Sequence, residues 1–285
     1  MRMKIISSIR EMQKTADELR LQGKRIGVVP TMGYLHEGHL SLVKHAREKS
    51  DVVILTIFVN PTQFGPSEDF KRYPRDFERD CRLAEGAGCD ILFTPETAEM
   101  YPQLFLTYIE VEKLSKMLEG KFRPTHFRGV TTVVAKLFNI TKPHVAVFGQ
   151  KDAQQAIIIK RMARDLNFDI EIIAAPIIRE LDGLAMSSRN VYLDPVERTE
   201  APLLRRSLDL AENMVRKGER DVKKIIEGME TLITSKKNAT LDYVAVVDPD
   251  SLADLRELES KRQVLIAVAI RIGNTRLIDN TLIAP

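Results

Sequence analysis

Short apolar segments rich in β-branched residues alternate with longer segments of helical spacing through the first part of the chain. The clearest strands are expected at Ile26–Thr31 and Asp51–Val59, which are apolar along nearly their whole length. A strand without polar alternation suits a parallel sheet that is covered on both faces. Helical segments between such strands favour an α/β domain with a Rossmann-like, doubly wound parallel sheet.

The same alternation continues to about residue 180 and then changes. Before the change, helices are expected at 8–23, 39–49, 76–87, 129–141 and 152–166, and further strands at 90–94, 107–111, 144–148 and 168–174. After it, two long helices at 195–217 and 221–236 precede strands at Leu241–Val247 and Val264–Ile272. This order predicts a smaller α+β C-terminal domain. We therefore expect two domains, 1–180 and 181–285, joined near Ile178–Gly183.

Length and composition exclude several classes of protein. The 285 residues are 44% hydrophobic, near the size at which one core divides into two. A formal charge of +3, from 43 basic and 40 acidic side chains, argues neither for nor against a nucleic-acid partner. Two cysteines, Cys81 and Cys89, cannot form a secretory disulfide framework. No signal peptide and no apolar run of roughly 18 residues is seen, so we expect a cytoplasmic protein without a membrane partner.

The loop after the first long strand is the candidate nucleotide site. It reads Pro-Thr-Met-Gly-Tyr-Leu-His-Glu-Gly-His from Pro30 to His39, and neither a P-loop nor Gly-x-Gly-x-x-Gly is present there. The glycines let backbone approach a ligand, and a helix N-terminus with two imidazoles suits phosphate oxygens. A zinc site is an alternative, although cysteine and carboxylate partners at zinc spacing are missing. A second alternative is a structural turn in which the two histidines have no functional role.

Three further segments carry polar groups where a nucleotide enzyme needs them. Asn60–Phe64 places amides after a strand, at the edge where open α/β sheets bind ligands. Gly149–Gln155 follows another strand and sets Lys151 beside a helix N-terminus, which suits a phosphate, while Asp152 can cap that helix or orient a ribose or metal. Met186–Asn190 combines hydroxyls with a cation near the domain joint.

Together these segments resemble the pantoate–β-alanine ligase family of the nucleotidyltransferase superfamily, which includes the HIGH-motif aminoacyl-tRNA synthetases. His36–His39 resembles the HIGH element, and Met186–Arg189 resembles the counterpart of the KMSKS loop. Tyr73–Arg75 and Thr125–Val130 are also typical of the family. The match runs from about residue 26 to residue 190 in the familiar order.

The resemblance implies an ATP-dependent ligase that makes pantothenate through pantoyl-adenylate and releases pyrophosphate and AMP. It implies pantoate, β-alanine and ATP as small-molecule substrates, Mg²⁺ with ATP, and a homodimer. His39 is expected to be the acid at the phosphates, and Gln63 and Gln155 to bind pantoate, with Gln63 also placing β-alanine. The expected catalytic residues are His36, His39, Lys151 and Arg189. The expected ATP-binding residues are Met32, Gly33, Tyr34, Leu35, His36, Glu37, Gly38, His39, Gly149, Gln150, Lys151, Asp152, Ile178, Met186, Ser187, Ser188 and Arg189.

One departure from the family and two other functions stay open. Arg79 stands where acidity is associated with metal in some family members, so the metal ligands remain unknown. An adenylyltransferase of the same superfamily would share the His-x-Gly-His element but lack the glutamine pair. An RNA-binding module would use the basic segment Lys121–Arg128, although no RNA-recognition aromatic signature accompanies it.

Overall fold

The computed structural model describes residues 3–66 and 68–285. These residues form two compact units. The first unit contains the described residues up to Gln150 together with Gln154–Pro176. The second unit contains Lys151–Ala153 and Ile177–Pro285.

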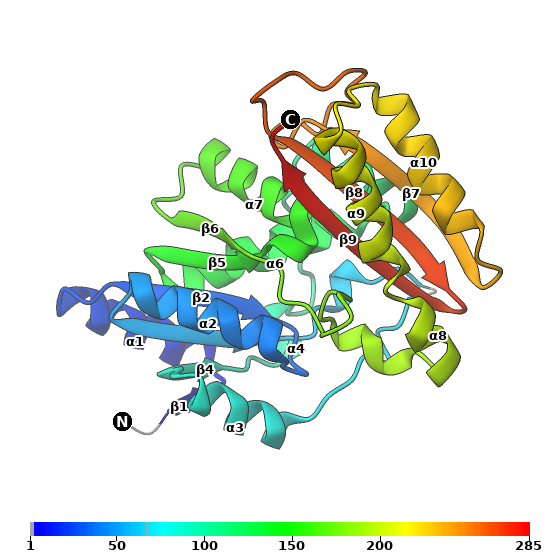
Figure 1. Cartoon of the computed structure of the whole chain (residues 1–285). Helices are drawn as coiled ribbons and strands as arrows, with labels where there is room; N and C mark the ends of the chain where they lie inside the picture. Colours follow the sequence, from blue (N-terminus) through cyan, green and yellow to red (C-terminus); the bar gives the residue numbers. More distant parts are fainter. Residues whose placement is uncertain (1–2, 67) are drawn as a thin grey trace. The chain divides into compact units, whose positions relative to one another are not determined.

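A six-stranded sheet, all of whose strand pairs are parallel, forms the centre of the first unit (Figure 1). Its order is β1-β4-β3-β2-β5-β6, so the chain reverses direction across the sheet between β2 and β5. The doubly wound sheet expected from the sequence is therefore confirmed. The strands are β1 (Lys4–Ile6), β2 (Ile26–Thr31), β3 (Val52–Ile57), β4 (Ile91–Phe93), β5 (Val145–Gly149) and β6 (Glu171–Ala175).

Both faces of this sheet are buried, which explains why its central strands are apolar throughout. Successive side chains of a strand point to opposite faces. Val28 accordingly packs in one core cluster, with residues of α1, α6 and α7, whereas Val29 packs in another, with residues of α2 and α3. The longer helices are α1 (Ile9–Leu21), α2 (Glu37–Lys49), α3 (Phe77–Gly86), α6 (His126–Thr141) and α7 (Ala153–Asp165). Short helical segments are η1 (Pro61–Gln63), α4 (Thr97–Met100), η2 (Leu114–Lys116), α5 (Glu119–Phe122) and η3 (Gln150–Asp152).

The second unit contains an antiparallel three-stranded sheet with the order β7-β8-β9. Its strands are β7 (Ala239–Val247), β8 (Val264–Ile272) and β9 (Thr275–Ile283), and its helical segments are η4 (Ser188–Tyr192), α8 (Pro195–Glu200), α9 (Leu203–Arg216) and α10 (Val222–Thr234). Leu208 of α9 and Ile225 of α10 join Ile266 of β8 in one buried apolar cluster. The small α+β fold expected for the C-terminal part is confirmed.

Two expected elements are wrong. Residues 107–111 form no strand. Hydroxyl groups of α6 take the place of a neighbouring strand, because Thr132 Oγ1 accepts the N–H of Ile109 and Thr131 Oγ1 donates to its carbonyl. The single helix expected at 195–217 is broken between α8 and α9, where Pro202 has no N–H to continue the hydrogen-bond ladder.

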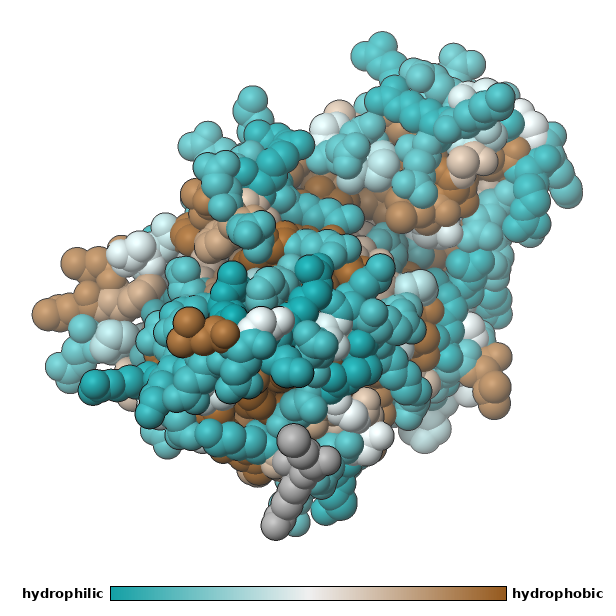
Figure 2. Space-filling model, turned by 90° about the vertical axis from the view of Figure 1, so that its left-hand side faces the viewer, coloured by the Kyte–Doolittle hydropathy of each residue, from teal (hydrophilic) through white to brown (hydrophobic). Residues whose placement is uncertain are grey.

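No helix among the described residues is long and apolar enough to cross a bilayer. The face drawn in Figure 2 is largely hydrophilic, with apolar side chains gathered in separate areas.

Candidate active site

The loop between β2 and α2 is held in a conformation that only particular residues permit. Gly33 has φ +82°, and a Cβ there would lie 2.9 Å from Ile57 Cγ2 and 3.0 Å from Asp80 Oδ2. Tyr34 follows, also with positive φ. The Asp80 carboxylate accepts the N–H groups of Tyr34 and Leu35, both at 2.7 Å. Asp80 therefore fixes the course of the loop that carries the predicted ATP-binding residues.

The two histidines of the expected HIGH element cap α2 together. His36 Nδ1 accepts the N–H of Gly38 at 3.2 Å, and His39 Nδ1 accepts the N–H of His36 at 3.4 Å. Their ring centroids are 4.1 Å apart. An Nδ1 atom that accepts a hydrogen bond carries no proton, so these contacts assign the proton of each neutral ring to Nε2. Two N–H donors thus belong to the positive end of a helix, an arrangement that suits phosphate.

Gln63 is the last residue of η1, the short helical segment that follows β3 in the chain, and it is buried. Its Oε1 accepts a hydrogen bond from Asn60 Nδ2 at 3.0 Å, and its Nε2 lies 3.2 Å from Met32 Sδ. Asn60 Nδ2 also donates to the carbonyl of Gly129 at 3.1 Å. The structure therefore brings Gln63 against Met32, joining two segments that the sequence placed in one site.

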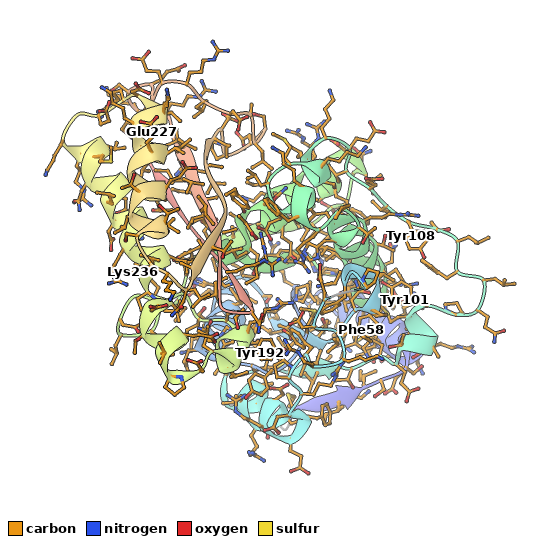
Figure 3. All side chains as sticks on the ribbon, turned by 90° about the vertical axis from the view of Figure 1, so that its right-hand side faces the viewer. Phe58, Tyr101, Tyr108, Tyr192, Glu227 and Lys236 are labelled. Carbon is orange, nitrogen blue, oxygen red and sulfur yellow. The ribbon has the colours of Figure 1, made fainter. Side chains whose placement is uncertain are left out.

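The Asn60 side chain is fixed by a hydrogen bond from Tyr101, a residue that the sequence did not single out as part of the site. The Tyr101 hydroxyl donates to Asn60 Oδ1 at 2.8 Å, and Thr62 Oγ1 donates to the same atom at 2.9 Å. Burial raises the pKa of Tyr101 above its ordinary value of 10.0, so the phenol remains a donor. Tyr101 lies beside Phe58, with ring centroids 6.2 Å apart (Figure 3).

The main chain of Gln63 is also fixed. His126 Nδ1 lies 2.9 Å from the Gln63 carbonyl, to which it donates. Arg123 forms a two-pronged ion pair with Glu68, at 2.9 and 2.6 Å. His126 lies in the Thr125–Val130 segment and Arg123 lies two residues before it; the family resemblance included this segment without assigning it a role.

Two neighbouring glutamines at the start of α7 have different environments. Gln154 is buried, and its side chain accepts the N–H of Glu119 and donates to the carbonyls of Leu114 and Met117. Gln155 is half-buried, and its side chain forms no hydrogen bond with any other residue that the structure describes. Of Gln154 and Gln155, only Gln155 has a side-chain amide that is available to bind a ligand.

Gly149 ends β5, and the predicted residues Gln150–Asp152 form the 3₁₀ turn η3. Lys151 Nζ lies 3.7 Å from Asp152 Oδ1, and the Lys151 side chain is 21% exposed. The helix begins at Ala153, so Asp152 belongs to the turn before it.

The other predicted ATP-binding residues form a hairpin and a turn in the second unit. The N–H of Met186 donates to the carbonyl of Ile178 at 3.0 Å, and Gly183 turns the chain with φ +91°. Ser187 Oγ then accepts the N–H of Arg189 at 3.2 Å and caps η4. Ile178, Met186 and the Ser187–Arg189 turn are thus held on one short, hydrogen-bonded segment.

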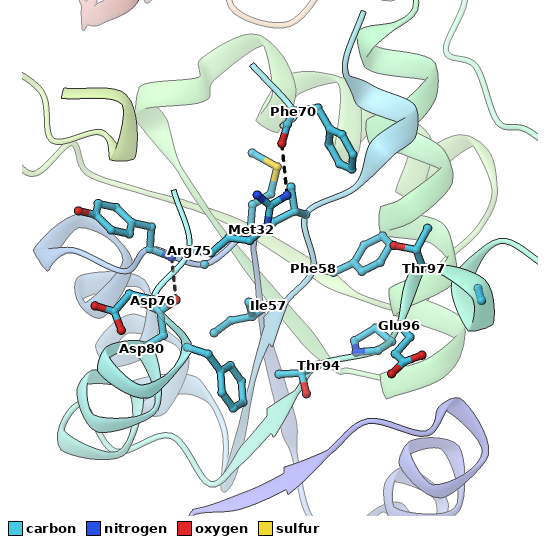
Figure 4. Close-up of a pocket in the computed structure, with 16 residues that line it drawn as sticks. Met32, Ile57, Phe58, Phe70, Arg75, Asp76, Asp80, Thr94, Glu96 and Thr97 are labelled. Carbon is cyan, nitrogen blue, oxygen red and sulfur yellow. Dashed lines mark hydrogen bonds between the residues drawn. The ribbon is translucent and has the colours of Figure 1, made fainter. Parts of the chain in front are cut away.

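A cavity of about 530 Å³ lies at the ends of β3 and β4 in the first unit (Figure 4). Met32, Gly33 and Tyr34 line it, but His36, His39 and Gln63 are not among its lining residues. The guanidinium of Arg75 donates to the carbonyls of Tyr73 and Phe70 at 2.9 and 3.2 Å. The cavity therefore adjoins the predicted ATP-binding loop, but the residues predicted to be catalytic do not line it. Its full lining is Met32, Gly33, Tyr34, Ile57, Phe58, Val59, Phe70, Arg75, Asp76, Phe77, Asp80, Thr94, Pro95, Glu96, Thr97 and Ala98.

The donor set around Asp80 does not fit a protein-held metal ion. Among the described residues, no group of three or more His, Cys, Asp and Glu side chains could hold one. Both Asp80 oxygens accept main-chain N–H groups, and the Arg79 guanidinium lies over the Tyr34 ring at 5.2 Å. Burial raises the pKa of Asp80, while its backbone hydrogen bonds act in the opposite direction.

Comparison with known proteins identifies relatives over the whole length of the chain. The family model described as pantoate-beta-alanine ligase matches residues 4–282. A pantothenate synthetase of Thermotoga petrophila is 58% identical, over 99% of this chain and 100% of the relative. That of Acetivibrio thermocellus is 55% identical, over 99% of each.

Solved structures agree with the sequence relatives. The crystal structure of pantothenate synthetase from Thermus thermophilus has a TM-score of 0.93 at 43% identity, covering 99% of this chain and 100% of the other. Pantoate-beta-alanine ligase from Francisella tularensis, complexed with beta-gamma ATP and β-alanine, has a TM-score of 0.76 at 34% identity, covering 98% and 97%.

Proposed function

The chain belongs to the pantoate–β-alanine ligase family, and from that premise we propose that it condenses (R)-pantoate with β-alanine at the expense of ATP. The pantoate carboxylate attacks the α-phosphorus and displaces pyrophosphate, which leaves pantoyl-adenylate. The amine of β-alanine then attacks the acyl carbon and displaces AMP. The observation that carries the proposal is the histidine pair on the N-terminus of α2, together with Gln63 against Met32.

The histidines supply the donors for the first step. Displacement at phosphorus moves negative charge onto the non-bridging and leaving oxygens, so a donor fixed there stabilises the transition state more than bound ATP. We assign this role to Nε2 of His39, assisted by His36, because capping holds the opposite nitrogen of each ring on the backbone. His39 donates a hydrogen bond from Nε2–H to the departing phosphate, while its Nδ1 accepts the N–H of His36.

Two further predicted site residues are the cations Lys151 and Arg189. Both suit the phosphates of ATP, and Arg189 is held by its own turn through Ser187. We assign Gly149–Asp152, Ile178 and Met186–Arg189 to the adenosine and triphosphate, as the family resemblance implies.

Amide side chains recognise the acid. Pantoate carries two hydroxyl groups, and each can donate and accept a hydrogen bond. A side-chain amide has both a donor NH₂ group and an acceptor oxygen, so it can bind a hydroxyl group in either role. Gln155 offers its amide from α7, and Gln63 is positioned by Asn60. Sites that bond a substrate hydroxyl reject analogues lacking it by about 10⁴-fold or more. Gln63 also places β-alanine for the second step.

Mg²⁺ enters with ATP as part of the substrate. Magnesium retains water and prefers phosphate oxygens with at most one or two carboxylates. Since both Asp80 oxygens already accept main-chain N–H groups, we assign no protein ligand to the ion.

A homodimer and a cytoplasmic location complete the proposal, together with the absence of nucleic-acid and membrane partners. The family resemblance implies the dimer. Sedimentation equilibrium of the purified protein tests it, and a single species of the 32.4 kDa protomer mass would contradict it.

Pyrophosphate exchange tests the reaction. Labelled pyrophosphate should enter ATP when pantoate is present and β-alanine is absent. Exchange that proceeds equally without pantoate would contradict the ligase and favour an adenylyltransferase. Pantothenate and AMP should then appear in equal amounts once β-alanine is added.

A further inference from the structure

Two successive polar residues of β9, Asp279 and Asn280, are buried to an unusual degree for their type. Asp279 is 2% exposed and Asn280 is 3% exposed. Buried polar side chains are retained where they satisfy other buried groups. Both residues contact segments of the second unit that we have assigned to ATP.

Asp279 holds the hairpin that carries Ile178 and Met186. Its carboxylate accepts two hydrogen bonds from the Arg179 guanidinium, at 2.6 and 3.0 Å. Arg179 Nη1 also donates to the carbonyl of Gly183 at 3.0 Å, across the turn of the hairpin. The backbone of Arg179 pairs with Ala185, next to Met186. The ion pair therefore fixes the hairpin to β9.

Asn280 holds the turn that carries Lys151. Its Nδ2 donates to the main-chain carbonyl of Lys151 at 2.9 Å, although the two residues are 129 positions apart. The N–H of Asn280 donates to Asp279 Oδ1 at 2.8 Å, which links the two anchors. Successive side chains of a strand point to opposite faces, so one strand can hold two separate segments.

We propose that Asp279 and Asn280 are positioning residues for adenylation, which fix the Lys151 turn and the Ile178–Met186 hairpin in one register. Both side chains are buried, so they act through Lys151 and through the segment that leads to Arg189. The inference rests on the proposed function, because it gives those two segments to ATP. A misplacement of about 1 Å in such groups can cost about 10²-fold in rate.

The test compares Asn280→Ala with Thr281→Ala, a half-buried neighbour on the same strand, in pantoate-dependent pyrophosphate exchange. Loss of one neutral hydrogen bond corresponds to about a 2- to 10-fold effect. Asn280→Ala should raise KM for ATP and lower kcat, each within about that range, and leave KM for pantoate unchanged. Thr281→Ala should match the wild-type protein in all three.

Asn280→Ser keeps a shorter hydroxyl donor and should recover part of the loss; it carries the test if the alanine variant does not fold. Asp279→Asn, which weakens the ion pair to Arg179, should show the same selectivity for ATP over pantoate. Folded Asn280 variants whose melting temperature falls while both ATP parameters stay normal would overturn the inference, as would equal losses for ATP and pantoate. Absence of pantoate-dependent exchange in the wild-type protein would instead contradict the proposed function.

Discussion

His36 and His39 cap the same helix through the same atom, Nδ1, each accepting a main-chain N–H group. The bonds that begin α2 therefore also decide which nitrogen of each ring carries the proton. The two imidazoles that begin α2 are therefore the same two that we propose as donors to phosphate.

His39→Ala should lower kcat for adenylation by about 10²-fold or more, because a donor aimed at the developing phosphate charge is lost. Binding of ATP should weaken only modestly. His39→Asn, which retains a donor at shorter reach, should recover part of the rate. His45→Ala on the same helix, where the side chain is 39% exposed, is the control and should turn over normally. A folded His39→Ala enzyme with near-normal turnover and a lowered melting temperature would make His39 a capping residue alone.

Gln155→Ala should raise KM for pantoate and leave KM for ATP within a few-fold, since a contact made equally in ground and transition states appears in KM. Gln154→Ala is the contrasting variant. It removes three hydrogen bonds to main-chain groups, so its melting temperature should fall. Equal weakening of pantoate and ATP in Gln155→Ala would argue against a pantoate-specific role.

Arg189→Ala should slow adenylate formation more than amide formation. A cation helps while charge gathers on the departing pyrophosphate, and that need ends when pyrophosphate leaves. Single-turnover rates from preformed pantoyl-adenylate measure the second step alone. A loss there as large as in the complete reaction would contradict this division.

Gly129→Ala should disturb Gln63 through the backbone. A Cβ at this position would lie 2.4 Å from the Thr62 carbonyl oxygen and 2.6 Å from the Gln63 nitrogen, which cannot move aside as a side chain can. We expect the free energy of unfolding to fall by about 1–3 kcal/mol and KM for pantoate to rise. Gly86→Ala is the matched control, because a Cβ there meets nothing within 4 Å. Denaturant titration that finds both variants equally stable would refute this account of η1.

His144 should make stability depend on pH. Burial, together with Arg20 and Arg25, holds the pKa of His144 below its ordinary value of 6.5, and its Nδ1 accepts the N–H of Ile26 at 2.9 Å. As pH falls, the unfolded chain binds this proton before the native protein does. The contribution is therefore fully present above pH 6.5 and is lost as pH falls from there through the lower native pKa.

His144→Asn can accept the same N–H through Oδ1 without titrating. Its melting temperature should fall less than that of the wild-type protein between about pH 7.5 and pH 5.5. Parallel declines in the two proteins would show that His144 does not carry this dependence.

Two of the apolar strands were predicted to the residue, whereas the one expected at Asp51–Val59 is shorter, Val52–Ile57. Ile26–Thr31 and Val264–Ile272 have the expected bounds. β1 is only three residues long and is defined by pairing with β4, far along the chain, which no local pattern reveals. β9 was missed because two polar residues, Asp279 and Asn280, interrupt its apolar pattern. Their side chains bind Arg179 and the Lys151 carbonyl, which are far away in the sequence.

The residues of the candidate site likewise fall into those that the sequence could single out and those that it could not. His36, His39 and the Ser187–Arg189 turn stand in contiguous motifs, so sequence alone could single them out. Asp80 and Tyr101 act on the loop residues Tyr34 and Asn60 from 46 and 41 positions away. Their roles depend on tertiary contacts, and a lone carboxylate or phenol carries no signal of such a contact. The assignments of substrate contacts remain predictions for the experiments above.

The pairing of β2 with β5 also has a consequence for the order in which the first unit folds. The N–H of Ile26 bonds to His144, 118 positions later, and this seam is the crossing point where the strand order reverses. Long-range pairing is slow, because the entropy of closing a large loop is lost before the contacts that reward it are made. Helices of the chain can form early, but the edge to which we assign ATP does not exist until β5 has docked. ATP affinity should therefore be acquired late in refolding, so the onset of nucleotide binding would report when β5 docks against β2.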